Sequence, residues 1–181
     1  EGAQIRNRYV AGDGIQLEHN RLVELTGDDV LGTAERISLS LPAIVDELVE
    51  GDVLSMDFNN VLLHVVERRG ASVVARVISA GRLGSNKAVT VIGRDLPLPV
   101  LTEKDRSALR IALEHDIRCF ALSFASGREA VESVRKLVGP GSQIISKIES
   151  LRGLRNIDAI LSASDAILID RGDLSREESL E

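Results

Sequence analysis

The chain has 181 residues, enough for one ordinary domain or two small ones. Apolar residues make up 44% and charged residues 28%, as is typical of a soluble globular protein. Aromatic residues are only 2% and the net charge is −6, which argues against base stacking and against non-specific binding to nucleic acid. No apolar run approaches the ~20 residues that a membrane span needs, so no membrane partner is expected.

Two smaller expectations follow from the cysteine and from the first residue. Cys119 lies in the apolar run 119–122 and is expected to be a buried, inert thiol. A single cysteine permits no internal disulfide, and this favours a reducing, cytoplasmic location. The chain starts at Glu1 and has no signal-peptide pattern, which predicts a processed chain or a piece of a longer protein.

Residues 1 to about 93 have the pattern of short β-strands separated by glycine and asparagine turns. The expected strands are 21–25, 35–39, 53–56, 61–66, 72–78 and 87–92. A helical turn is expected within 41–49, where Pro42 suits a helix start. This pattern predicts a small barrel or sandwich.

From about residue 100 the pattern alternates between strand and helix. Thr102 is expected to cap a helix that runs to about His115, with Asp105 three residues on in an approximate capping box. Ser126 is expected to cap the next helix, with Glu129 completing its capping box. A third helix is expected over the apolar positions between 154 and 161. The expected strands are 118–122, 143–146 and 166–169.

The strand-to-strand repeat of roughly 24 residues is usual in (β/α)8 barrels. Three strands cannot close a barrel that needs eight, so the second half is expected to be part of a longer protein or an open, incomplete sheet.

Charged residues follow two successive strands of this alternation. Lys147 and Glu149 come at the end of the strand at 143–146, and Asp170 and Asp173 follow the strand at 166–169. In parallel α/β folds the carboxyl ends of the strands are where chemistry is done. Two carboxylates and an ammonium group suit a divalent cation beside a phosphate or an enolate.

Seven segments resemble, in order, motifs of the pyruvate kinase family. They are 2–6 (family GPEIR), 51–66 (the GD…DDG hairpin), 81–87 (GG-x-LGSKKG), 96–105 (DLP-x-L(S/T)EKD), 122–124 (ASF), 144–149 (IISKIE) and 171–174 (RGDL). The last two match letter for letter, and the resemblance covers the whole chain.

The resemblance implies an enzyme that transfers a phosphoryl group from phosphoenolpyruvate to ADP, with Mg2+ or Mn2+ and usually K+. It implies that Lys147 stabilises charge on the transferring phosphoryl group. Glu149 and Asp173 would bind the divalent metal, and Ser123, Gly172 and Asp173 would contact the substrate. These roles agree with the general need of phosphoryl transfer for positioning and charge neutralisation.

On the nucleotide side, the resemblance implies that Arg6 and Lys87 face the phosphates of ADP or ATP. The family's K+ ligands, in an NFSHG segment, would precede Glu1, and the threonine that protonates the enolate would follow Glu181. The chain alone is therefore expected to be weakly active or inactive, and to associate with itself or belong to a longer chain.

The chain departs from the family pattern at several positions. In the DDG hairpin only Asp57 is kept, because Phe58 and Asn59 replace the second acid and the glycine. Ser126 replaces the arginine after ASF-x, and Asp170 replaces an alanine, adding negative charge beside the expected anion site.

The resemblance implies an α/β fold with an all-β insert. Residues 1–7 and 91–181 would form part of a (β/α)8 TIM barrel, and residues 8–90 a small β-barrel or sandwich capping domain. Two alternatives to a pyruvate-kinase-type phosphotransferase stay open. One is a paralogue or regulatory module that keeps only the Mg2+/oxyacid half-site, and the other is a non-enzymatic β-domain interaction module.

Overall fold

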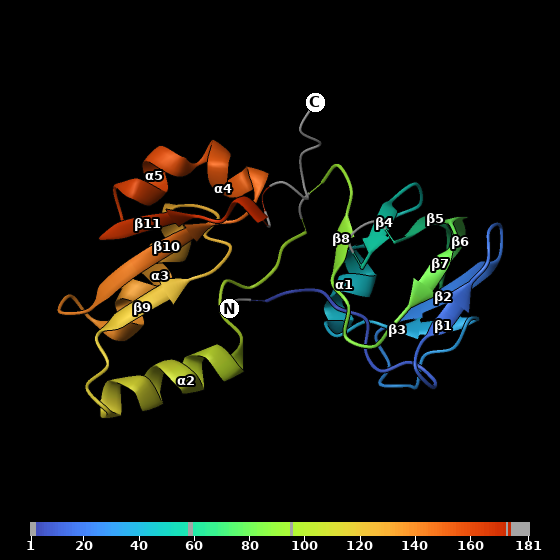
Figure 1. Ribbon diagram of the computed structural model, residues 1–181, viewed down its shortest axis with the longest axis horizontal. Helices are drawn as coiled ribbons and strands as arrows, with labels where there is room; N and C mark the ends of the chain where they lie inside the picture. The colour runs from blue at the N-terminus through green and yellow to red at the C-terminus, as the bar shows by residue number, and fades with distance from the viewer. Residues whose placement is uncertain (1–2, 58–59, 95, 173, 175–181) are drawn as a thin grey trace. The chain divides into compact units, whose positions relative to one another are not determined.

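The computed structural model describes residues 3–57, 60–94, 96–172 and 174, and the chain divides into two compact units (Figure 1). Residues 4–97 form one unit, called the β unit below, and residues 98–181 together with the first three form the other, called the α/β unit. In the described part of the chain, no helix is both long enough and apolar enough to cross a membrane.

The β unit is built on a six-stranded sheet with the order β3-β2-β6-β5-β4-β8. All neighbouring strands are antiparallel except β2 and β3, which are parallel. The strands are β2 (Leu22–Thr26), β3 (Arg36–Ser38), β4 (Val53–Met56), β5 (Val61–Arg69), β6 (Ser72–Ser79) and β8 (Val89–Val91). The predicted strands of this half therefore all exist, with bounds that shift by a few residues.

A second, two-stranded sheet pairs β1 (Ile15–Leu17) with β7 (Gly81–Leu83), and neither strand was predicted. Both strands are three residues long and stand next to turn residues, Gly12 to Gly14 before β1 and Gly84 to Asn86 after β7, so these segments resemble loops in the sequence. At Gly81 a Cβ atom would collide with the backbone carbonyl of Asn60, which explains the glycine at the start of β7.

The core of the β unit is aliphatic, as the low aromatic content requires. Its strands alternate, so that in β5 Val61, Leu63 and Val65 point inward. The helix α1 (Pro42–Glu47) adds Ile44 and Val45 to the buried set. The largest fully buried side chains of this unit are Leu17, Leu25, Ile37, Leu39, Leu48, Leu54, Met56, Leu63 and Leu83.

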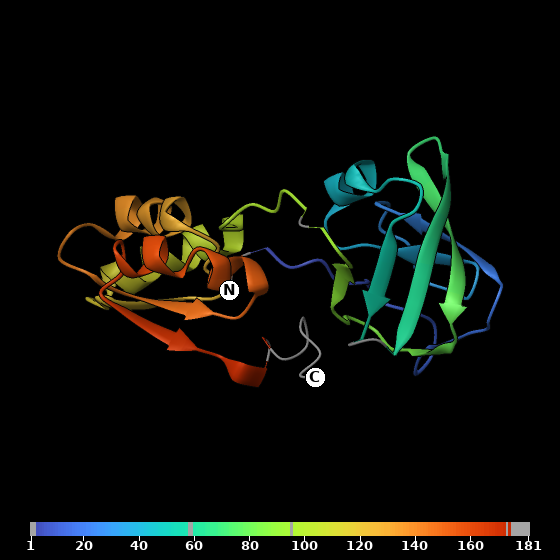
Figure 2. The ribbon, with the colours of Figure 1, turned by 90° about the horizontal axis from the view of Figure 1, so that it is seen from above.

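The α/β unit contains a parallel sheet with the order β11-β10-β9. Its elements are α2 (Glu103–Glu114), β9 (Cys119–Leu122), α3 (Arg128–Val138), β10 (Gln143–Ile148), α4 (Leu151–Arg155), α5 (Ile157–Leu161) and β11 (Ala166–Ile169). Figure 2 shows the helices of this unit on one face of the sheet. The buried Ile144 and Ile148 of β10 share a core cluster with residues of α3, whereas Leu168 and Ile169 of β11 are about half exposed.

Two helix predictions are wrong. The cap of α3 is Gly127, not Ser126, and no side chain caps it. The amide of Ala125 still bonds to the carbonyl of Lys147, so the chain leaves the sheet edge too late for a helix to begin at residue 126. The third predicted helix is two short ones, α4 and α5, separated at Asn156, whose side-chain amide donates to the carbonyl of Ser126.

The expectation of a buried cysteine is also wrong, because Cys119 is exposed. It opens β9, an edge strand in which only Leu122 is buried. An apolar sequence neighbourhood does not reveal whether a strand lies at the edge of a sheet.

Candidate active site

The candidate site lies at the carboxyl edge of the parallel sheet, around the ammonium group of Lys147. Strand β10 continues to Ile148, two residues beyond the prediction, because Lys147 and Ile148 pair with Leu168 and Ile169 of β11. Lys147 is therefore a strand residue. The alternation of β10 buries Ile144 and Ile148 against α3 and places Lys147 on the opposite face.

Glu149 follows β10 directly, and its carboxylate is almost completely buried, with 2% of the side chain exposed. Its Oε1 accepts a hydrogen bond from Nζ of Lys147, and its Oε2 accepts one from the amide of Phe124 at 2.7 Å. Phe124 has a φ of +50°, the left-handed region. A buried carboxylate requires such compensation, because its desolvation is costly unless it is paired and hydrogen-bonded.

A second carboxylate faces the same ammonium. Oδ2 of Asp170, which follows β11, lies 3.6 Å from Nζ of Lys147, and its Oδ1 accepts the amide hydrogen of Gly172 at 3.1 Å. The hydrogen bond to Glu149 and the negative charges of Glu149 and Asp170 raise the pKa of Lys147, against the opposing effect of burial. Lys147 is therefore a cation at neutral pH.

The remaining predicted residues of this unit lie near these elements. Ser123 is half-buried in the turn after β9 and precedes Phe124. Gly172 lies in helical residues after β11, where its amide meets Asp170. Asp173 is outside the described residues.

Arg6 and Lys87 lie in the β unit, on neighbouring segments. The amide of Asn7 bonds to the carbonyl of Lys87 at 3.1 Å, and the guanidinium of Arg6 donates to the carbonyl of Asn86 at 3.0 Å. The ammonium of Lys87 pairs with Asp57 at 3.3 Å. Phe58 and Asn59 are outside the described residues.

A polar hollow of about 280 Å3 opens beside Arg6 within the β unit. Arg6 bonds to two of the residues that line it, through its amide to the hydroxyl of Ser40 and through its guanidinium to Asn86. Its lining residues are Asn7, Arg8, Tyr9, Asp29, Ser40 and Asn86.

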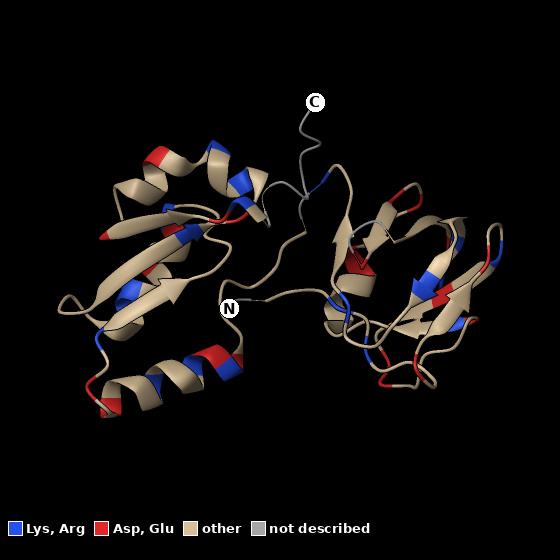
Figure 3. Cartoon of the chain, viewed as in Figure 1, with Lys and Arg blue, Asp and Glu red and all other residues tan. Residues whose placement is uncertain are grey.

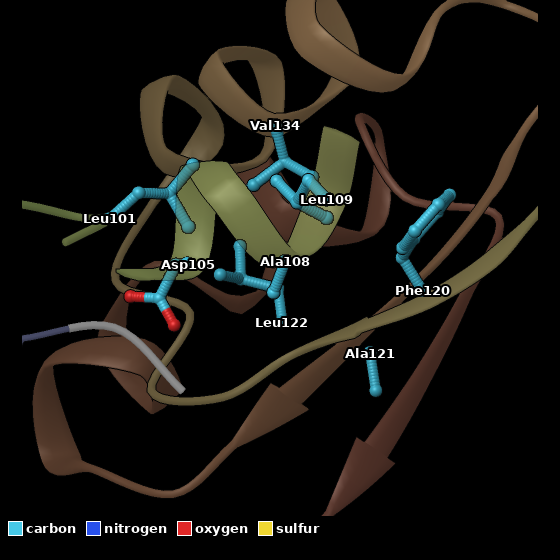
Figure 4. Close-up of a pocket in the computed structure, with 8 residues that line it drawn as sticks. All are labelled: Leu101, Asp105, Ala108, Leu109, Phe120, Ala121, Leu122 and Val134. Atoms are coloured by element: carbon cyan, nitrogen blue, oxygen red, sulfur yellow. The ribbon is translucent and has the colours of Figure 1, made fainter. Parts of the chain in front are cut away.

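The α/β unit has a separate cavity of about 130 Å3 beneath α2 (Figure 4). Its lining is apolar apart from the carboxylate of Asp105, which is bonded to Thr102 in the helix cap. Acidic and basic residues are distributed along α2 (Figure 3). The cavity lies against a helix that has no fully buried residue.

The carboxylate groups around Lys147 are of the type that binds a hard cation such as Mg2+. Carboxylate oxygens are the ligands that Mg2+ prefers, and the charge of Glu149 is already balanced by a cation, the ammonium of Lys147. Among the residues that the structure describes, no three His, Cys, Asp or Glu side chains are grouped so as to hold a metal ion. Glu149 is thus the one predicted metal ligand that the structure describes, because Asp173 lies outside the described residues.

Sequence reasoning missed one contact in each unit. The amide of Phe124 holds Glu149, and a positive φ at a phenylalanine has no sequence signal. The pairing of Lys87 with Asp57 joins segments 30 residues apart, and only the folded β unit reveals it.

Parallel strands that alternate with helices and carry charged residues at their carboxyl edge define this part of the chain as a piece of an α/β barrel domain. The chain belongs to the pyruvate kinase family: the family model "Pyruvate kinase, barrel domain" matches residues 1–180.

Curated relatives agree with this assignment. The chain is similar to the pyruvate kinase of Geobacillus stearothermophilus, with 33% identity over 98% of this chain and 31% of the relative. It is 30% identical to the pyruvate kinase of Thermotoga maritima over 99% of this chain and 39% of the relative. It is 33% identical to the pyruvate kinase of Corynebacterium glutamicum over 100% of this chain and 39% of the relative. The chain thus spans between three tenths and four tenths of the length of these relatives.

Proposed function

We propose that the chain is part of a pyruvate-kinase-type phosphotransferase that transfers a phosphoryl group from phosphoenolpyruvate to ADP. The observation that carries the proposal is the contact of Lys147 with Glu149 at the carboxyl edge of a parallel sheet. The family membership supports it, since the relatives are named pyruvate kinases.

In this proposal a phosphate oxygen of ADP forms a bond to phosphorus, and the bond from phosphorus to the enol oxygen breaks. The electron pair of that bond stays on the enol oxygen, and protonation of the enolate then yields pyruvate. Lys147, a permanent cation at neutral pH, stabilises the negative charge of the transferring group. Ser123 and Gly172 contact the substrate, together with Asp173.

Mg2+ or Mn2+ is the proposed divalent cofactor, held by Glu149 and Asp173, and K+ is the further cofactor that the family resemblance implies. A divalent cation bound there would supply neutralisation of phosphoryl charge. Arg6 and Lys87 are proposed to contact the nucleotide phosphates. The polar hollow beside Arg6 supports this, because two of its lining residues, Ser40 and Asn86, accept hydrogen bonds from Arg6.

The proposal also covers the division of the chain into domains. Residues 8–90 would form the β capping domain, and residues 1–7 and 91–181 would belong to a (β/α)8 barrel. As a step of glycolysis the reaction takes place in the cytoplasm, in agreement with a chain that has a single cysteine.

A second candidate function is favoured by one observation. Asp170 lies 3.6 Å from the ammonium of Lys147, and this added negative charge opposes an anionic substrate. The alternative is a pyruvate-kinase-like paralogue or regulatory module that keeps the Mg2+/oxyacid half-site without phosphorylating ADP.

The proposal is tested by the binding of phosphoenolpyruvate in the presence of Mg2+, measured by titration calorimetry. We expect Lys147→Met to weaken binding by at least about tenfold, because a charge-assisted contact to the phosphoryl group is lost. Lys136→Met makes the same change at an exposed position of α3 and should bind as wild type. Circular dichroism checks that both variants are folded. Equal affinity of wild type and folded Lys147→Met would refute the proposal.

A further inference from the structure

One ammonium group faces two carboxylates at this edge of the sheet. Lys147 is bonded to Glu149, and Oδ2 of Asp170 lies 3.6 Å from the same nitrogen. The two acids differ in access to water, since 2% of the Glu149 side chain and 35% of the Asp170 side chain are exposed. Counting these three side chains, the cluster carries a net negative charge before any ligand arrives.

The hydrogen bonds of the two carboxylates to backbone amides also differ in exposure to water. Glu149 is buried and bonded through its second oxygen to the amide of Phe124, so it cannot leave the ammonium without breaking a buried contact. Asp170 is held by an amide hydrogen of Gly172 in the next turn of chain and is partly in water. Of the two, Asp170 is the one that an incoming anion would displace or repel.

We propose that Asp170 occupies the Lys147 ammonium when no ligand is bound and weakens the binding of oxyanions there. The inference rests on the proposed function, because it requires that Lys147 contacts the phosphoryl group of a ligand. A phosphate that approaches Lys147 meets a like charge a few ångströms away. It binds only after Asp170 has turned toward water or after that repulsion has been overcome.

The test uses inorganic phosphate as the probe and the complete 181-residue chain. Asp170→Asn keeps the shape of the side chain and an oxygen that accepts the Gly172 amide, but removes the charge. We expect it to bind phosphate about threefold to tenfold more tightly than wild type in calorimetry at low salt, the range for a partly exposed charge. Asp170→Glu restores the charge and should return the affinity toward that of wild type.

A matched control is Asp116→Asn. This variant removes one negative charge from the loop before β9, at the amino end of a strand of the same unit. The side chain of Asp116 is 92% exposed. Its φ of +57° is a conformation that asparagine tolerates, so the variant should fold and bind phosphate as wild type does.

The outcomes separate this inference from the proposed function. If Lys147→Met abolishes phosphate binding but Asp170→Asn binds as wild type, Asp170 is only a structural residue and the inference fails while the role of Lys147 stands. If Lys147→Met binds phosphate unchanged, the proposed phosphoryl contact of Lys147 fails. A lack of phosphate binding by both wild type and Asp170→Asn also overturns the inference.

Discussion

Among single residues, the site depends most on how the chain supplies hydrogen bonds to the buried carboxylate of Glu149. Glu149 receives a hydrogen bond from a side-chain cation and another from the backbone amide of Phe124. Without such partners, removal of a charged group from water would lower the free energy of unfolding by several kcal/mol, in order of magnitude. These two hydrogen bonds fix the position of the Glu149 carboxylate at the end of β10.

Replacement of Glu149 by glutamine should weaken Mg2+ or Mn2+ binding by about tenfold or more, because an amide oxygen is a poorer ligand for a hard cation than a carboxylate. Titration calorimetry of the metal into wild type and Glu149→Gln measures this change. Glu114→Gln, an exposed position of α2, is the control and should leave the metal affinity unchanged. Equal affinity of wild type and Glu149→Gln would remove the metal assignment.

At the scale of elements, the helices differ in what stabilises them. Helix α3 buries Ala130, Val131, Val134 and Val138 against the sheet, whereas α2 has no fully buried residue. Packing therefore contributes less to α2, and its capping box contributes more.

The capping box of α2 has the two reciprocal bonds that its sequence predicts. The hydroxyl of Thr102 accepts the amide hydrogen of Asp105 at 3.1 Å, and the carboxylate of Asp105 accepts the amide hydrogen of Thr102 at 2.8 Å. Burial raises the pKa of Asp105, but hydrogen bonds, among them those from Thr102, outweigh it and lower the pKa from 3.8 to about 2.

Asp105→Asn should lower the free energy of unfolding at pH 7 by about 1 kcal/mol, the usual contribution of a helix cap. Because the pKa of Asp105 is lowered in the folded state, its ionised carboxylate stabilises the folded protein at pH values above 3.8. This stabilisation is lost as the pH falls toward about 2. The difference between the two proteins in urea unfolding should therefore shrink between pH 4 and pH 2.

The control for this prediction is Glu103→Gln, which removes an exposed acid from the same first turn without touching the capping box. It should cost less stability than Asp105→Asn at pH 7. A difference between wild type and Asp105→Asn that stays constant down to pH 2 would contradict the assignment of the pKa to the folded cap.

In the β unit, the ends of elements are held by arginine side chains. Arg68 donates to three backbone carbonyls at the end of α1, those of Val45, Asp46 and Leu48. Arg94 donates to both carboxylate oxygens of the buried Asp52, and this hydrogen bonding lowers the pKa of Asp52, outweighing the opposing effect of burial. These contacts satisfy carbonyls and a buried acid that would otherwise lose their hydrogen bonds with water.

At the scale of the whole molecule, the two units differ in how completely they bury their strands. In the β unit, β5 lies between β4 and β6 inside a six-stranded sheet, and its inward residues are buried. In the α/β unit the helices cover one face of three strands, and β11 keeps Leu168 and Ile169 about half exposed. An apolar sheet with open edges gains stability when further strands or a second copy of the chain cover it.

We therefore expect backbone amides of residues 144–148 in β10 to exchange with deuterium faster than those of residues 61–66 in β5, in a dilute monomer. Hydrogen exchange followed by mass spectrometry compares the two strands in one experiment, and sedimentation verifies the monomer. Raising the protein concentration should slow exchange in β10 if copies of the chain associate through this sheet. Slower exchange in β10 than in β5 in the verified monomer would instead identify the α/β unit as a complete, independently stable domain.

Residue patterns in the sequence predict the division into a β-rich and an α/β half, most strand positions, the α2 capping box and the pyruvate kinase family. Each of these depends on local periodicity, turn residues or short motifs, which are properties of neighbouring positions. The folded chain was needed to see that β1 and β7 form a sheet, that Cys119 is exposed and that the amide of Phe124 bonds to Glu149. The contact between Asp170 and Lys147 also depends on the folded chain, because it joins the ends of two strands that are paired by long-range hydrogen bonds. Long-range pairing selects which strands become edges and which side chains meet, and no local pattern encodes that choice.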